Sequence, residues 1–243
     1  MLQQQNTFGT EGQRFVSNYL VPTIKKQGQV STSLHQESSG SRLELERFIT
    51  QKFADAHSAT IRTFMPRLIA LNHETETTAV IGIRSASEKP FFLEQYMDCP
   101  IEQAISSSCL KNVGRKDIVE IGNFAAKGAS AGGLLFTLLA ESLRKSGFKW
   151  MTFTATTEIE KMISRLGCQP DILSDALPEK LDEDADDWGA YYQRAPRVMA
   201  CNLEHTIDAA LKNRRLETIF TQHKAETTSL ARSIRLTNNQ RSR

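Results

Sequence analysis

The chain has 243 residues, with 30 Lys and Arg against 28 Asp and Glu, which gives a formal net charge of +2. This length suits one well-buried domain with tails and is too short for two large domains. The near-neutral charge argues against a dedicated nucleic-acid-binding protein, whose binding face would be strongly basic. We therefore expect one core domain and no nucleic-acid partner.

Cysteine usage and hydropathy indicate the compartment. The first residues lack the basic start and apolar run of a secretory signal. The longest nearly apolar stretch, Gly132 to Ala140, is about half as long as a membrane-spanning helix. We predict a cytoplasmic protein with reduced thiols, no transmembrane segment and no metal site. No CxxC motif and no zinc-like spacing to a histidine occurs among the four cysteines, which are Cys99, Cys109, Cys168 and Cys201.

The two ends of the chain are predicted to lie outside the core domain, which spans residues 39–204. Residues 1–38 are rich in Gln, Ser, Thr and Gly, so they bury too little apolar surface to offset the entropy of ordering. We expect them to be mostly disordered. Residues 205–243 predict a basic amphipathic helix followed by disorder. Two roles stay open for that helix, contact with an anionic membrane or packing in an oligomer or domain contact.

Three segments in the first half show clear apolar patterns. Apolar residues at three-and-four spacing predict an amphipathic helix within residues 39–56. Residues 67–72 and 78–84 are rich in β-branched residues and flank an acidic turn, so they predict a hairpin. Residues 116–124 resemble a buried strand that carries Glu120.

Strands and helices then alternate. The small-residue run 126–133 leads into a leucine-rich helix that Gly147 is expected to end. Residues 150–155 predict another strand, residues 157–166 another helix, and residues 197–203 a last strand. This order places the chain in the α/β or mixed α+β class.

The small-residue run before the helix is a candidate phosphate site. Backbone N–H groups at a helix N-terminus suit a phosphate or pyrophosphate. The run matches neither GxxxxGK[ST] nor GxGxxG, so a plain tight turn is an equally weighted alternative. The residues that would let a ligand approach are Gly128, Ser130, Gly132 and Gly133.

A carboxylate and two phenols are candidates for catalysis. Glu120 would act as a general base if burial raises its pKa, whereas a salt bridge to Arg115 or Lys127 would make it structural. Tyr191 or Tyr192 would protonate a leaving thiolate, or would serve as a packing anchor. The sequence leaves both pairs of alternatives open.

Other polar residues are weaker candidates. Glu94, Tyr96 and Asp98 share one face if their segment is extended, although a solvated edge explains them nearly as well. His57 and His73 lack metal-type spacing, so we expect structural roles. No cysteine has an evident base beside it, which favours thiols without a catalytic role.

The motifs, in their order, resemble the bacterial thermostable hemolysin family over about residues 42–204. The most specific are VEIGNFAA with the small-residue loop after it, and WGxYY at residues 188–192. This resemblance implies a relation to the GNAT acyltransferase superfamily and to acyl-homoserine-lactone synthases. It implies a GNAT-like single domain with flexible tails, in which helices flank a mixed, mostly antiparallel central sheet.

The resemblance also implies a site for an acyl-CoA or acyl carrier protein as cosubstrate, with no tightly bound cofactor. In GNAT enzymes the pantetheine lies where the fourth strand separates from the fifth, and the loop before the central helix holds the pyrophosphate. Here that loop lacks the usual (Gln/Arg)-x-x-Gly-x-(Gly/Ala) signature, and Glu120-Ile-Gly-Asn123 stands where lactone synthases have Glu-x-x-Arg. The implied donor site consists of Asn123, Phe124, Ala125, Lys127, Gly128, Ser130, Gly132 and Gly133. The implied acceptor site consists of Glu94, Tyr96, Asp98, Thr154, Trp188 and Tyr191, with Glu120 and Tyr192 as catalytic residues.

The residues and the resemblance together predict acyl transfer from a thioester to an amine-bearing small molecule, with Glu120 as the base. One alternative is a membrane-active hemolysin that binds lipid through its basic C-terminal segment. A second is a protein that binds an acyl carrier without turnover. A homodimer and peripheral membrane contact also stay open.

Overall fold

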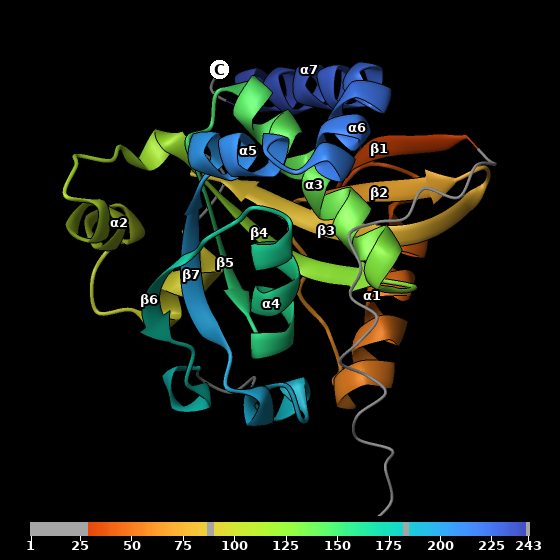
Figure 1. The fold of residues 1–243 in the computed structure, drawn as a ribbon. Helices are drawn as coiled ribbons and strands as arrows, with labels where there is room; N and C mark the ends of the chain where they lie inside the picture. The colour runs from red at the N-terminus through yellow and green to blue at the C-terminus, as the bar shows by residue number, and fades with distance from the viewer. Residues whose placement is uncertain (1–28, 87–89, 182–184, 242–243) are drawn as a thin grey trace, which may run out of the picture.

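A seven-stranded sheet runs through the molecule in the order β1-β2-β3-β4-β5-β7-β6 (Figure 1). The computed structural model describes residues 29–86, 90–181 and 185–241. Neighbouring strands are antiparallel except for β4 and β5, which are parallel, and this confirms the predicted mixed sheet. The strands are β1 (Val30–Gln36), β2 (Arg67–His73), β3 (Glu76–Ser85), β4 (Ile118–Ala126), β5 (Trp150–Ala155), β6 (Asp171–Asp175) and β7 (Arg197–Asn202).

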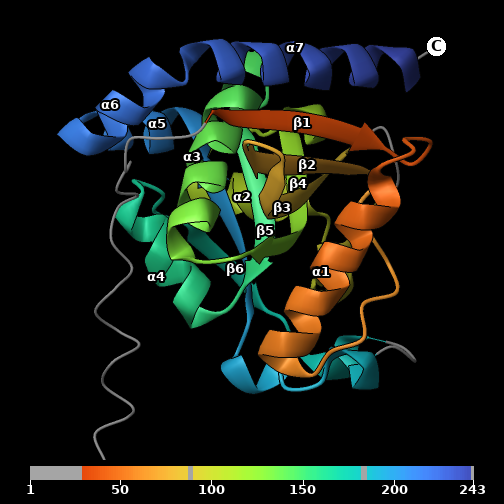
Figure 2. The same cartoon turned by 90° about the vertical axis from the view of Figure 1, so that its right-hand side faces the viewer.

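Helices cover both faces of this sheet (Figure 2). α1 (Arg42–His57) packs on one face, whereas α3 (Ala129–Ser146) and α4 (Thr157–Arg165) pack on the other. Each face has its own apolar core. Gly147 ends α3 in the left-handed region, with φ 101°, as predicted. The remaining helices are α2 (Ile101–Cys109), α5 (Leu203–Leu211), α6 (Arg214–Gln222) and α7 (Lys224–Arg241).

Both ends of the described chain depart from the predicted disorder. Val30–Gln36 falls within the predicted disordered segment 1–38, yet it pairs along the whole of β2. Polar residues dominate this edge strand, so its sequence shows no apolar alternation. The prediction for residues 1–28 lies outside the described residues. At the other end, helix continues to Arg241, so the expectation of disorder there is wrong.

The apolar face of the C-terminal helices is buried within the domain. Leu216 and Ile219 of α6, and Leu230 and Ile234 of α7, belong to the same core as α3. Of the two roles considered for this segment, the structure therefore shows packing within the domain. None of the described helices combines the length and apolar character needed to cross a bilayer.

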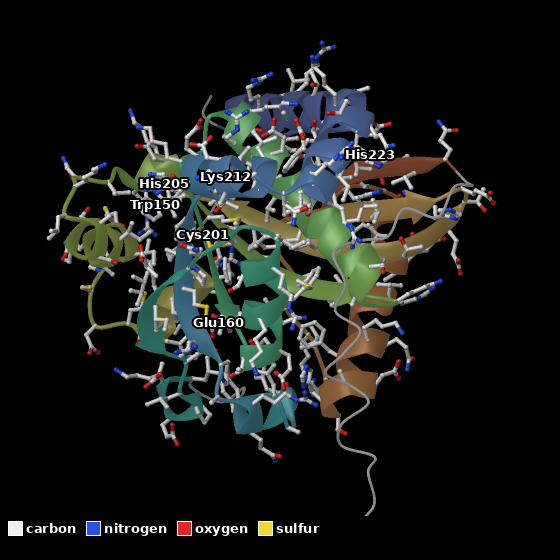
Figure 3. The ribbon with its side chains drawn as sticks, viewed as in Figure 1. Trp150, Glu160, Cys201, His205, Lys212 and His223 are labelled. Atoms are coloured by element: carbon white, nitrogen blue, oxygen red, sulfur yellow. A yellow bond between two sulfur atoms is a disulfide. The ribbon has the colours of Figure 1, made fainter. Side chains whose placement is uncertain are left out.

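A disulfide joins Cys168 to Cys201, contrary to the predicted reduced thiols. Cys168 follows α4, and Cys201, labelled in Figure 3, lies in β7, so the bond ties the end of a helix to the sheet. The two residues are separated by 33 positions, and no local pattern signals their pairing. Cys99 and Cys109 are free. Within the described ranges, no group of three His, Cys, Asp or Glu residues could hold a metal ion.

β4 and β5 separate after a short stretch of pairing. Ile118–Glu120 of β4 pairs with Trp150–Thr152 of β5. The two strands are not paired beyond Glu120 and Thr152. Further along β4, the register with β3 shifts between Val80 and Gly82, and Asn123 takes a left-handed φ of 48°. Such a bulge bends a strand and increases its twist, and here it turns β4 away from β5.

Candidate active site

A cavity of about 670 Å³ lies where β4 and β5 separate. Its lining comes from both faces of the sheet, with Phe53 and His57 on the α1 side and Phe136 and Ile163 on the side of α3 and α4. Glu120 lies at the end of the paired stretch and also lines the cavity. The volume is within the roughly 300–1,000 Å³ typical of small-molecule sites. This cavity is the candidate active site.

Glu120 is 2% exposed. Its two carboxylate oxygens accept hydrogen bonds from the backbone N–H groups of Phe92 and Leu93, each at 3.0 Å. Arg84 places Nη1 3.6 Å from Oε2. Burial dominates over these contacts and raises the pKa of Glu120 to about 7, from 4.5. A carboxyl group with this pKa exchanges a proton readily near neutral pH.

The two salt bridges considered for Glu120 are not formed. Arg115 instead binds Glu94 and Glu102, with N–O distances of 2.6 and 2.8 Å. Lys127 pairs with Glu76. The charged neighbour of Glu120 is Arg84, which comes from the adjacent strand β3 and directly faces Glu120 in the register. Glu120 is therefore available to the cavity rather than locked into either predicted pair.

An aromatic wall closes the α1 side of the cavity. The Trp188 ring lies 5.3 Å from that of Tyr191 and 6.0 Å from that of Phe92. This wall is anchored to the end of α1, because the N–H of Ala190 donates to the carbonyl of His57 at 2.7 Å. The predicted acceptor residues Thr154, Trp188 and Tyr191 all line the cavity.

The tyrosine hydroxyl groups form a contact that the sequence did not indicate. Tyr96 and Tyr192 are joined by a hydrogen bond of 2.6 Å between their hydroxyls. Tyr96 lines the cavity, whereas Tyr192 is not among the lining residues and reaches it through Tyr96. Burial raises the pKa of Tyr192 to about 12 and raises that of Tyr96 further. Both phenols therefore stay protonated at neutral pH.

The glycine-rich loop contributes part of the predicted donor site. Gly128 precedes α3 and lines the cavity with Gly132. A Cβ at Gly132 would lie 2.9 Å from Cζ of Phe124, so a side chain there would crowd the lining. Asn123, Phe124 and Ala125 also line the cavity. The predicted donor residues Lys127, Ser130 and Gly133 are not among the lining residues.

Glu94, Tyr96 and Asp98 do not share a face, which corrects the extended arrangement considered above. Phe92–Tyr96 forms a short 3-10 helix, so its side chains do not alternate. Glu94 turns to Arg115 and also accepts from the N–H of Ile101. Asp98 is exposed and pairs with Lys180, away from the cavity lining. Only Tyr96 of the three reaches the candidate site.

Two cavity-lining residues were not assigned to the site from the sequence, His57, for which a structural role was expected, and Arg84. His57 lines the cavity, its Nδ1 is buried without a hydrogen-bond partner among the described residues, and burial lowers its pKa. Arg84 follows the apolar run of β3 and also lines the cavity. An arginine directly after the apolar run 79–83 was the available signal for Arg84.

Comparisons with known proteins agree with this architecture. A family model for thermostable hemolysin matches residues 35–207. Among curated proteins, none matches the sequence. The fold is also found in solved structures that include an acyl-homoserine lactone synthase, and at this low identity the likeness concerns the fold alone.

Three solved structures are similar to this chain to the following extents. TofI in an apo form is 13% identical, with 76% of this chain and 98% of TofI covered and a TM-score of 0.51. BjaI, described as a CoA-dependent acyl-homoserine lactone synthase with SAM and isopentyl-CoA, is 9% identical, with 80% and 89% covered and a TM-score of 0.50. FeeM, an N-acyl amino acid synthase from uncultured soil microbes, is 11% identical, with 76% and 97% covered and a TM-score of 0.49.

Proposed function

This chain belongs to the thermostable hemolysin family, and we propose that it is an acyltransferase that moves an acyl group from a thioester to an amine-bearing small molecule. The observation that carries the proposal is Glu120, a buried carboxyl group with a pKa near 7 at a cavity that opens between two parallel strands. The fold shared with BjaI supports the same class of reaction.

The proposed donor is an acyl-CoA or an acyl carrier protein, with its pantetheine arm in the gap between the strands. Ile121 to Ala126 of β4 form one wall, and Phe153–Ala155 of β5 form the other. An extended arm with amide groups can pair with an open strand edge as an added strand does. The N-terminus of α3 begins after Gly128 at the same cavity, and its N–H groups suit a pyrophosphate.

The proposed step is direct transfer with Glu120 as the base. The acceptor nitrogen attacks the carbonyl carbon of the thioester, a C–N bond forms and the C–S bond breaks. The nitrogen loses its proton to the Glu120 carboxylate, and Glu120 then passes this proton to the leaving thiolate, which becomes a free thiol. The products are an amide and a thiol, so atoms and charges balance.

Tyr96 is proposed to donate a hydrogen bond to charge that develops on the thioester in the transition state. Because its pKa is raised, the phenol donates without losing its proton at neutral pH. Tyr192 holds the Tyr96 hydroxyl in place through their shared hydrogen bond and so acts as a positioning residue. This assigns Tyr192 an indirect part in place of the direct proton donation predicted from the sequence.

The test is an acyl-transfer assay with purified protein, acyl-CoAs of graded chain length, acylated carrier protein and a mixture of amines and amino acids. Free-thiol release reports donor cleavage, and mass spectrometry of the reaction mixture reports the amide. We expect equal amounts of thiol and amide. Thiol release without an amide would mean thioester hydrolysis and would contradict the proposed acceptor.

Two further outcomes separate the alternatives. A melting shift with a donor but no product from any acceptor would support an acyl-carrier-binding protein without turnover, because a ligand that binds only the folded state raises the melting temperature. Leakage of liposomes by the protein in the absence of donor and acceptor, with no acyl transfer, would support the membrane-active alternative.

A further inference from the structure

Arg84 occupies an unusual position for a charged residue. Its side chain is 11% exposed, and it lines the cavity beside Glu120. The two residues face each other in the antiparallel register of β3 and β4, so their side chains project from the same face of the sheet. That face carries α1 and the aromatic wall, which is the side opposite α3 and the proposed pyrophosphate site.

Toward the residues that the structure describes, the guanidinium group of Arg84 uses few of its five N–H donors. Nη1 donates to the carbonyl of Pro90 at 3.0 Å. The 3.6 Å between Nη1 and Glu120 is longer than a hydrogen bond. Nε is buried and has no partner among the residues that the structure describes, and no hydrogen bond from Nη2 to a described residue is present.

These two nitrogens form one edge of the planar guanidinium, and that edge matches a carboxylate with two parallel hydrogen bonds. A buried donor left without a partner costs about 1–3 kcal/mol, so an unpaired one at a cavity calls for an explanation. The ion pair with Glu120 does not provide one, because it involves Nη1 and leaves Nε without a partner.

We propose that Arg84 binds a carboxylate of the acceptor, and that the acceptor is therefore an amino acid whose amine faces Glu120. This inference rests on the acyl-transfer function proposed above and names its substrate class. In an α-amino acid the nitrogen and the carboxyl carbon are about 2.5 Å apart, given standard N–Cα and Cα–C bonds. Arg84 and Glu120 are register partners on neighbouring strands, with 3.6 Å between Nη1 and Oε2, so one small molecule that carries both groups can reach both residues.

The aromatic wall narrows the class further. Phe92, Trp188 and Tyr191 line the same cavity as Arg84, and the backbone N–H of Phe92 donates to Glu120, which faces Arg84. Aromatic surfaces bury apolar groups effectively and gain from ring-to-ring contacts. The side chain of the acceptor is accordingly apolar or aromatic, with leucine and phenylalanine as the first probes.

The test compares each amino acid with the amine that lacks only its carboxylate, namely phenylalanine with phenethylamine and leucine with isoamylamine. The quantity measured is the ratio of kcat/KM for the acid over the amine. We expect the wild-type protein to prefer the amino acid, and Arg84→Gln to lower the ratio by roughly 10- to 100-fold, the value of a lost charge-assisted hydrogen bond. Arg84→Lys should lie between them, because an ammonium keeps the charge but not the two-pronged geometry.

The ratio of the two kcat/KM values does not depend on how much of a variant is correctly folded, because a smaller active fraction lowers both values equally. If Arg84→Gln and Arg84→Lys leave the ratio unchanged, or if wild type shows no preference for the acid, the inference is wrong. Arg144→Gln is the matched control, because Arg144 pairs with Glu141 and Glu204 and is not among the lining residues. It should keep the wild-type ratio.

A binding readout keeps this inference separate from the proposed function. If no acceptor is acylated, the acyl-transfer proposal fails, yet Arg84 can still be tested by the melting shift that phenylalanine produces. A shift with phenylalanine that exceeds that with phenethylamine in wild type, and is lost in Arg84→Gln, would support the carboxylate site. Equal shifts in both proteins would overturn it.

Discussion

Asn123 Oδ1 accepts a hydrogen bond from the backbone N–H of Met65 at 2.7 Å, and Nδ2 donates to the carbonyl of Thr63 at 3.3 Å. These contacts join the bulge of β4 to the segment that follows α1. Asn123 also has a left-handed φ of 48°, which asparagine tolerates better than most residues. One side chain therefore holds the bend that turns β4 away from β5.

Asn123→Ala is expected to lower the free energy of unfolding by about 1–3 kcal/mol, because it removes these hydrogen bonds and leaves a Cβ at positive φ. Asn123→Gly removes the same hydrogen bonds but relieves the strain, so it should be less destabilising than alanine. Urea denaturation of the three proteins measures both effects. Equal stability of wild type and Asn123→Ala would contradict a role in holding the bulge.

Glu120→Gln is expected to lower kcat/KM for acyl transfer by roughly 10²- to 10⁴-fold, since an amide of similar shape cannot accept the acceptor's proton. The control is Glu102→Gln, which changes a carboxylate that pairs with Arg115 and is not among the cavity-lining residues. Free-thiol release with a verified donor and acceptor measures both rates. Unchanged turnover in Glu120→Gln would exclude Glu120 as the base.

The rate of acyl transfer should increase with pH through about 7. Burial raises the pKa of Glu120 to that value, so the base is largely protonated at pH 6 and largely ionised at pH 8. The profile of kcat/KM against pH should flatten above this range. In Glu120→Gln, the residual rate should lack this inflection.

The raised pKa of Glu120 should also make the folded protein less stable as pH rises. A carboxyl group whose pKa rises on folding favours the protonated folded state, so its contribution to folding is lost as pH rises from 4.5 through about 7. The slope from this one group is at most about 1.4 kcal/mol per pH unit. Denaturation of wild type and Glu120→Gln at pH 5 and pH 8 isolates this contribution as the difference between the two proteins.

Loss of the Cys168–Cys201 disulfide is expected to lower the free energy of unfolding by about 2–4 kcal/mol, because the bond restricts the unfolded chain. Cys201→Ser, or reduction of the wild-type protein, should show this loss in urea denaturation. Cys99→Ser is the control, since Cys99 is free and exposed. A wild-type protein whose stability is the same with and without reductant would contradict the disulfide's stabilising effect.

Ile234→Ala is expected to cost about 2–5 kcal/mol, because Ile234 of α7 is fully buried against α3. Leu236→Ala, two positions along the same helix, is the matched control, since Leu236 is 57% exposed. Thermal or urea denaturation compares the pair. Similar small effects in both variants would mean that α7 is not docked on the domain in solution.

The elements predicted from periodicity agree with the structure where one face or both faces are strongly apolar. The helix within residues 39–56, the hairpin at residues 67–84 and the strand that carries Glu120 all form. β1 was missed because its sequence is mostly polar and it gains its hydrogen bonds from β2, which no local pattern reveals. The disulfide was missed for a related reason, since its two cysteines meet only in the folded chain.

The sequence was sufficient to single out Glu120, but not the residues that surround it in the folded chain. Glu120 stood out because a carboxylate within a buried strand is rare. Its partner Arg84 depends on the register of β3 against β4, which the sequence does not specify. Trp188 and Tyr191 were implied by the family resemblance, but their anchoring to α1 runs through the backbone carbonyl of His57, and backbone contacts leave no signature in side-chain patterns.

The separation of β4 from β5 gives the sheet four edges in place of the usual two. β1 and β6 are the outer edges, and the diverging lengths of β4 and β5 add an inner pair. Backbone groups along a strand edge readily accept another extended chain, which for an outer edge is a risk of aggregation. Here the inner edges lie within the protein beside a cavity. Their backbone N–H and C=O groups can therefore bind only molecules small enough to enter that cavity.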